Sequence, residues 1–171
     1  MAKPRVMVYN FAVQSHMGGT SCRGRLHDLR KSKTEMVELI QVWAALESMS
    51  ARLSTLHATD AQISGLRRLL DGYQVPTEQS LADYSMVNLA FHDAIIDLGG
   101  SQTIACMTRK LLSHVRLIRR VTLNRSRAAS LLDQDLQIMR ALEERRTELA
   151  EVLTRQQTLD LAARVDEYRW C

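Results

Sequence analysis

The chain has 171 residues, of which 46% are hydrophobic, 25% are charged and only 5% are aromatic. Pro and Gly are scarce, at 2 and 7 residues, so a β-sandwich or barrel with its many turns and aromatic strand residues is disfavoured. The common residues are Leu, Ala, Arg, Glu, Gln and Met, which favour helices. The hydrophobic fraction argues against disorder, and no apolar run reaches the roughly 18 residues of a membrane span.

The net charge of +4 is concentrated at the N-terminus. Residues 1–34 carry seven basic side chains and one acidic side chain, a net charge of +6, so the remainder of the chain sums to −2. Such an arm is either a solvated leader or a contact for nucleic acid or acidic lipid. It has no convincing secretory signal, and three widely spaced cysteines suit reduced thiols. We therefore expect a cytoplasmic protein.

From residue 35 onward, apolar residues recur at spacings of three and four, which predicts consecutive amphipathic helices. The first helix is expected over about 35–56. Capping and breaking residues then mark the other helices. Thr59 and Gln62 open a second helix that runs to about Asp71, and Pro76 and Thr77 open a third that ends at Gly99 and Gly100. Ser101 caps a fourth helix, a break at 124–126 precedes a fifth, and Thr147 starts a sixth.

Six helices joined by short loops predict an all-α fold, an antiparallel bundle of about six helices that follows the basic N-terminal arm. The arm, residues 1–34, shows no recognisable DNA-binding domain. Residues 35–171 are expected to form one helical domain.

Asn88 and His92 stand four residues apart on the third predicted helix, so both side chains point the same way. Such a pair offers two donors to a metal ion or to a ligand in a bundle core. A lone histidine at the edge of an apolar face is more commonly a core residue bonded to its neighbours. The spacing alone favours that simpler interpretation.

The surrounding sequence resembles a known family. The stretch from Asn88 through Phe91, His92 and Ile95, followed by Leu98-Gly-Gly-Ser101, resembles the D-x-x-F-H-x-x-I…S-G-N block of the ligand-binding (FCD) domain in FadR-type GntR transcription regulators. Residues 46–59 resemble the opening helix of that domain. Residues 138–142 resemble its H-x-x-I-L-x-A-I helix, and the resemblance extends over about 35–168.

The resemblance implies an effector-binding and dimerisation domain, not an enzyme. It implies a homodimer that binds a small organic acid, in which an Asp and three His hold a divalent metal ion. At those four positions this chain has Asn88, His92, Asp135 and Gln157. One imidazole, one carboxylate and two amides suit zinc poorly. Three interpretations of these four residues remain open: weak binding of a hard ion by His92 and Asp135, a metal-free polar pocket, or a residual core network.

A basic cluster lies on and around the fourth predicted helix. Arg109, Arg116 and His114 are candidates for contact with an anionic effector, because a guanidinium pairs well with a carboxylate. The alternative is a solvated helix face. DNA contact is expected to be weak and salt-dependent through the arm, or to come from a missing or separate reader domain.

Two other classes of function are weighed against the regulator. His57, His92 with Asp93, and Asp135 match the order of ligands in HD-type metal-dependent phosphohydrolases, which are also helical. Consecutive helical residues diverge by about 100°, so Asp93 is expected to tilt away from His92. The third class is a helical protein-interaction module without a small ligand.

Overall fold

The computed structural model describes residues 32–71 and 80–165, apart from several side chains in the second half of the fourth helix. Most of the basic arm and the residues Pro76 and Thr77 therefore lie outside the described residues. Within the described ranges the secondary structure is helical, with no strand. None of the helices described is long and apolar enough to cross a membrane.

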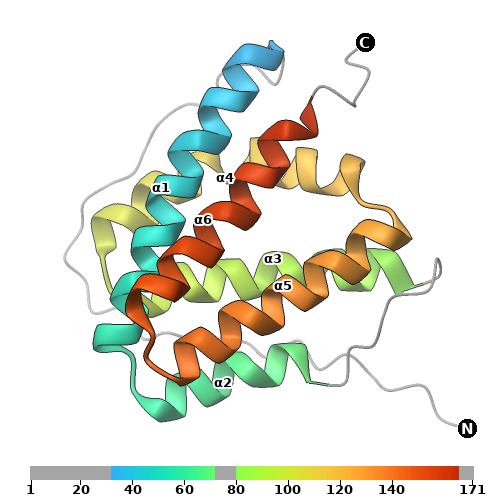
Figure 1. The fold of residues 1–171 in the computed structure, drawn as a ribbon. Helices are drawn as coiled ribbons and strands as arrows, with labels where there is room; N and C mark the ends of the chain where they lie inside the picture. Colours follow the sequence, from blue (N-terminus) through green and yellow to red (C-terminus); the bar gives the residue numbers. More distant parts are fainter. Residues whose placement is uncertain (1–31, 72–79, 166–171) are drawn as a thin grey trace, which may run out of the picture.

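Six helices account for the described fold. They are α1 (Lys33–His57), α2 (Asp60–Leu70), α3 (Leu81–Leu98), α4 (Gln102–Thr122), α5 (Arg125–Glu143) and α6 (Thr147–Ala163). The prediction of an all-α bundle is confirmed. Figure 1 shows α1 and α6 side by side and running in opposite directions. α1 also contacts α3, α4 and α5, and α3 contacts α2, α4 and α5 in addition to α1.

Side-chain caps explain where the helices begin. Thr59 and Gln62 form the predicted capping box of α2, and Ser101 Oγ accepts from the backbone N–H of Ile104 at the start of α4. α1 begins at Lys33, slightly before the predicted start, because Ser32 and Glu35 form a capping box that the sequence analysis missed. The predicted boundary at residue 34 thus falls inside this helix.

The described interior contains three apolar clusters, of which the third is small and consists of Tyr84, Ala128 and Leu132. The first combines residues of α1, α2, α3, α5 and α6, including Phe91 and Leu142, and the second combines residues of α1, α3, α4 and α6, including Ile40 and Leu161. Along α1 the second cluster ends at Trp43 and the first begins at Ala51, with buried polar residues between them. The helices therefore position a polar layer inside the bundle.

Cys106 on α4 is disulfide-bonded, which contradicts the expectation of reduced thiols. Both of the other cysteines of the chain lie outside the described residues. Wide spacing along the sequence does not keep two thiols apart in space, because folding brings distant segments together.

α1 and the end of α3 approach each other closely at Gly99. A Cβ atom added at Gly99 would stand 2.9 Å from the backbone oxygen of Ser50 and 3.0 Å from its Cα. Both atoms belong to the helical backbone of α1, which cannot move aside as a flexible side chain would. The approach thus requires a glycine for reasons of space.

We expect Gly99→Ala to lower the free energy of unfolding by about 1–3 kcal/mol, because the added methyl group pushes α3 away from α1. Gly65→Ala in the middle of α2 is the control, since its Cβ would meet only the Arg68 side chain, at 3.6 Å. That change should raise stability by about 0.5–1 kcal/mol through helix propensity. Urea denaturation of the two variants measures both effects, and a neutral Gly99→Ala would contradict the close packing.

Arg145 closes the C-terminus of α1 from the turn between α5 and α6. Its Nη1 donates to the backbone oxygens of Thr55 and Ala58 at 3.2 and 2.7 Å, groups that the helix itself leaves unpaired. Its own backbone adopts the left-handed region, with φ of 56°, at a helix end where glycine is usual. The guanidinium of Arg145 therefore caps a helix that is distant in the sequence.

Two substitutions of Arg145 separate its two roles. Arg145→Gly removes the guanidinium contacts but relieves the left-handed backbone, whereas Arg145→Ala removes the contacts and keeps the strain. We expect both to be less stable than the parent, with the alanine variant about 1 kcal/mol below the glycine variant. Thermal unfolding of the three proteins tests this order, and a glycine variant as stable as the parent would show that the contacts contribute nothing.

Candidate functional site

His92 on α3 is the centre of a buried polar layer. Its Nδ1 lies 2.7 Å from Glu47 Oε1 on α1, and its Nε2 lies 3.6 Å from Asp135 Oδ1 on α5. The three residues are at most 1% exposed. A neutral imidazole has one ring N–H and the imidazolium has two, so the ring can donate toward both carboxylates only when it is protonated.

Glu47 has further partners on two helices. Its Oε2 accepts from Trp43 Nε1 at 2.8 Å and from Thr158 Oγ1 at 2.6 Å. Trp43 and Glu47 are four residues apart, which places both on the inner face of α1. Sequence reasoning did not select Glu47 as a site residue, although an acidic residue four positions after a core tryptophan is a signal that could have found it.

Asp135 forms hydrogen bonds with the remaining predicted site residues. Its Oδ1 accepts from Gln157 Nε2 at 2.8 Å, and its Oδ2 accepts from Asn88 Nδ2 at 2.8 Å and from Tyr84 OH at 3.2 Å. Asn88, His92, Asp135 and Gln157 therefore come together as the family packing predicted. We call this set the polar core: Trp43, Glu47, Tyr84, Asn88, His92, Asp135, Gln157 and Thr158.

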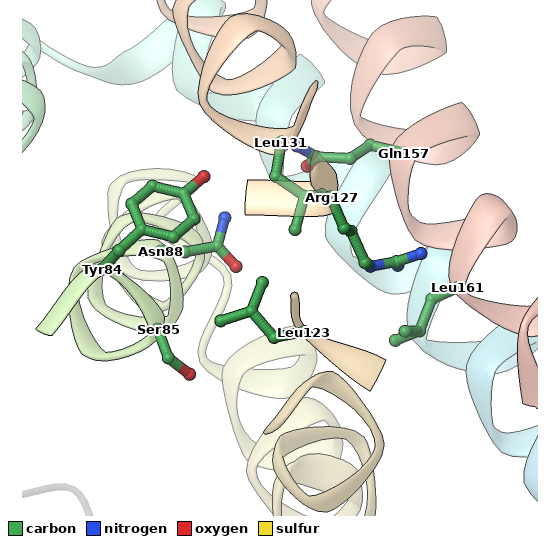
Figure 2. Close-up of a pocket in the computed structure, with 8 residues that line it drawn as sticks. All are labelled: Tyr84, Ser85, Asn88, Leu123, Arg127, Leu131, Gln157 and Leu161. Atoms are coloured by element: carbon green, nitrogen blue, oxygen red, sulfur yellow. The ribbon is translucent and has the colours of Figure 1, made fainter. Parts of the chain in front are cut away.

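A pocket adjoins the polar core on the side of Asp135. Figure 2 shows the residues that line it: Tyr84, Ser85, Asn88, Leu123, Arg127, Leu131, Gln157 and Leu161. Its free interior volume is about 10 Å³, on the order of one water molecule. Gln157 Oε1 is buried and has no hydrogen-bond partner among the described residues. The guanidinium of Arg127 lies beside Leu161 (Figure 2).

The four residues at the family's metal positions do not fit a metal ion. Two ligands that share one ion at about 2.1 Å stand about 3.4 Å apart in a tetrahedral site. The contacts of Asp135 with Asn88 and Gln157 are 2.8 Å, which is the length of a hydrogen bond. Within the described part of the chain, no group of three His, Cys, Asp or Glu side chains is arranged to hold a metal ion.

Arg109 and Arg116 lie elsewhere, over a depression between α3 and α4. Arg109 pairs with Asp97 at 2.9 Å and Arg116 with Asp93 at 2.7 Å. Burial raises the pKa of the Asp93 carboxyl above its ordinary value, although the Arg116 guanidinium opposes this shift. The residues lining this α3–α4 depression, whose volume is about 200 Å³, are Trp43, Asp93, Ile96, Asp97, Thr108, Arg109 and Arg116.

The two arginines are thus placed apart from the pocket beside Asp135, and their contact with an effector stays a prediction. His114 is half-buried on α4, and its predicted contact with an effector is equally untested. Asp93 turns toward α4 while its neighbour His92 points into the core, as the helical spacing predicted. With His57 exposed at the end of α1, the HD-type arrangement of metal ligands is not assembled in the described residues.

The comparison with protein families gives one match. The model described as the FCD domain matches residues 38–158. This range begins within α1, ends within α6 and contains every member of the polar core. No curated protein is similar enough to the chain to match it.

A metal site should be recoverable by substitution. The triple variant Asn88→Asp, Asp135→His and Gln157→His adds two imidazoles and a carboxylate around His92, so we expect it to bind Zn²⁺ far more tightly than the parent. Isothermal titration with ZnCl₂ measures the difference. A variant that also carries His92→Ala is the control and should lose most of the gain. Equal affinities of parent and triple variant would mean that these positions cannot surround one ion.

Proposed function

The chain belongs to the FCD domain family, whose model covers most of its length, and from this membership we propose that it is the effector-binding and dimerisation domain of a GntR-type transcription regulator. The effector in this proposal is a small organic acid. The protein acts in the cytoplasm as a regulator and not as an enzyme. DNA contact belongs to the N-terminal arm, which lies outside the described residues, or to a separate reader domain.

One observation carries the choice of site. The polar core joins α1, α3, α5 and α6 inside the FCD-matched segment, and a pocket lies directly against it. Ligand sites in helical bundles are commonly built from inward side chains of facing helices. Arg127, which is 9% exposed, brings a positive charge to this pocket, and a carboxylate is its natural complement.

The proposed mechanism is thermodynamic linkage. An effector that binds one arrangement of the helices more tightly shifts the protein toward that arrangement by its difference in affinity, and by no more. Residues of the pocket come from α3, α5 and α6, and these helices are connected to α1 through His92 and Glu47. A ligand in the pocket therefore contacts the same hydrogen-bond network that holds α1 in place.

The dimer in this proposal would use the outer face of α1. Val42, Met49 and Leu56 follow one another at intervals of seven, and they are 50%, 40% and 58% exposed. Residues seven apart lie on one side of a helix, so these apolar side chains form a single stripe. Burial of such a stripe in a two-fold interface would remove it from water.

Native mass spectrometry combined with thermal shift tests the proposal. We expect a species of twice the 19.4 kDa subunit mass, and a saturable rise in melting temperature with small carboxylic acids. Met49→Glu, in the middle of the stripe, should shift the protein toward the subunit mass. A monomer throughout the micromolar range would contradict the dimer, and metal-dependent hydrolysis of a nucleotide would favour the enzyme alternative.

A further inference from the structure

The α3–α4 depression is larger than the pocket beside Asp135 and has an apolar floor. Its volume of about 200 Å³ equals that of about seven water molecules at about 30 Å³ each. Trp43, Ile96 and Thr108 line it and are 1%, 5% and 1% exposed. The indole N–H of Trp43 donates to Glu47 and the hydroxyl of Thr108 donates to the backbone oxygen of Ile104, so both polar hydrogens are used within the protein. The floor therefore suits the apolar part of a small molecule.

Two ion pairs form the rim of the α3–α4 depression. Asp93 and Asp97 are one turn apart on α3, and they pair with Arg116 and Arg109 of α4 at 2.7 and 2.9 Å. The four formal charges cancel. A ligand with a single charge is repelled by one kind of side chain as it approaches the other, whereas a ligand that carries both charges can complement both. The rim thus favours a zwitterion.

The two ion pairs use only part of the hydrogen-bonding capacity of these side chains. Each pair joins one Nη2 atom to one carboxylate oxygen, and no further side-chain partner of the four residues is found in the part of the chain that the structure describes. A guanidinium has five N–H donors, and a carboxylate accepts on two oxygens. A ligand can therefore bind the remaining N–H groups and the second oxygen while both ion pairs stay intact.

The pair of Asp93 with Arg116 offers the stronger contact of the two. Their side chains are 36% and 48% exposed, against 53% and 63% for Asp97 and Arg109, so water competes less with a ligand there. The two charges of this pair are adjacent, with 2.7 Å between nitrogen and oxygen. An α-amino acid carries its ammonium and carboxylate on the same carbon. Its two charges can therefore lie beside the pair in the opposite order.

We propose that the α3–α4 depression binds a free α-amino acid with an apolar side chain. Its carboxylate accepts from Arg116, its ammonium donates to Asp93, and its side chain lies against Ile96 and Trp43. The depression opens between α3 and α4, apart from the pocket beside Asp135, so this inference goes beyond the proposed function and does not depend on it. The available volume suits a molecule of roughly seven to ten non-hydrogen atoms, such as leucine.

Three probes that share one branched carbon skeleton test the class of ligand. They are L-leucine, 4-methylpentanoate, which lacks the ammonium group, and 3-methylbutylamine, which lacks the carboxylate. Each is titrated calorimetrically into the full chain. We expect leucine to bind at least about tenfold more tightly than either analogue, because each analogue loses one charge-assisted contact. Glycine should also bind more weakly than leucine, since it buries no apolar side chain. Equal affinities of leucine and 4-methylpentanoate would overturn the inference.

Two neutral substitutions assign the contacts separately. Asp93→Asn should remove the preference for leucine over 4-methylpentanoate, and Arg116→Gln should remove its preference over 3-methylbutylamine. Glu143→Gln is the matched control, because it disrupts another exposed ion pair, with Arg67 at 3.4 Å, and should keep both preferences. Circular dichroism verifies that each variant is folded, and the comparison of probes on the parent protein needs no variant. Both preferences unchanged in the two variants would overturn the inference.

A last variant distinguishes this site from the pocket of the proposed function. Ser85 lines the pocket beside Asp135, so Ser85→Phe obstructs that pocket and should leave leucine affinity unchanged. A loss of leucine binding in Ser85→Phe but not in Asp93→Asn would place the amino acid beside Asp135, which would overturn the inference and leave the proposed effector function standing. No saturable binding of leucine would also overturn the inference alone, because the carboxylic acids test the proposed function independently.

Discussion

The structure depends on one buried arrangement, the imidazole of His92 between the carboxylates of Glu47 and Asp135. Removing charged groups from water is costly, and only partners with good geometry compensate for it. Here each carboxylate receives additional donors, from Trp43 and Thr158 on one side and from amide and phenol groups on the other. The two carboxylates are therefore tolerated inside the bundle because Glu47 accepts two hydrogen bonds and Asp135 accepts three.

This arrangement determines how the helices can pack. The partners of His92 come from α1 and α5, and those of the two carboxylates come also from α3 and α6. A slip of any one helix by a turn would leave a buried charge without its partner, whereas apolar contacts would largely re-form. The polar core specifies one register for four helices, and the apolar clusters around it supply most of the burial.

The same network explains why a family position can change without loss of the fold. In the family, according to the resemblance, an Asp and three His surround a metal ion. Here Asn88 and Gln157 donate N–H groups to the carboxylate of Asp135, so a set of hydrogen bonds occupies the centre of the bundle. Gln157, whose Oε1 has no hydrogen-bond partner among the described residues, also lines the small pocket beside Asp135.

The sequence by itself determined the helices and most of their ends, because apolar spacing and capping residues such as Thr59 and Ser101 act locally. Through the family resemblance it also predicted that Asn88, His92, Asp135 and Gln157 converge. Only the tertiary structure showed Glu47 as the second carboxylate and Arg145 as the cap of another helix, since each acts on residues distant in the chain. The tertiary structure also decided that Arg116 faces α3 and not the pocket beside Asp135. The direction of this side chain depends on the rotation of α4 about its axis, which packing determines and local sequence does not.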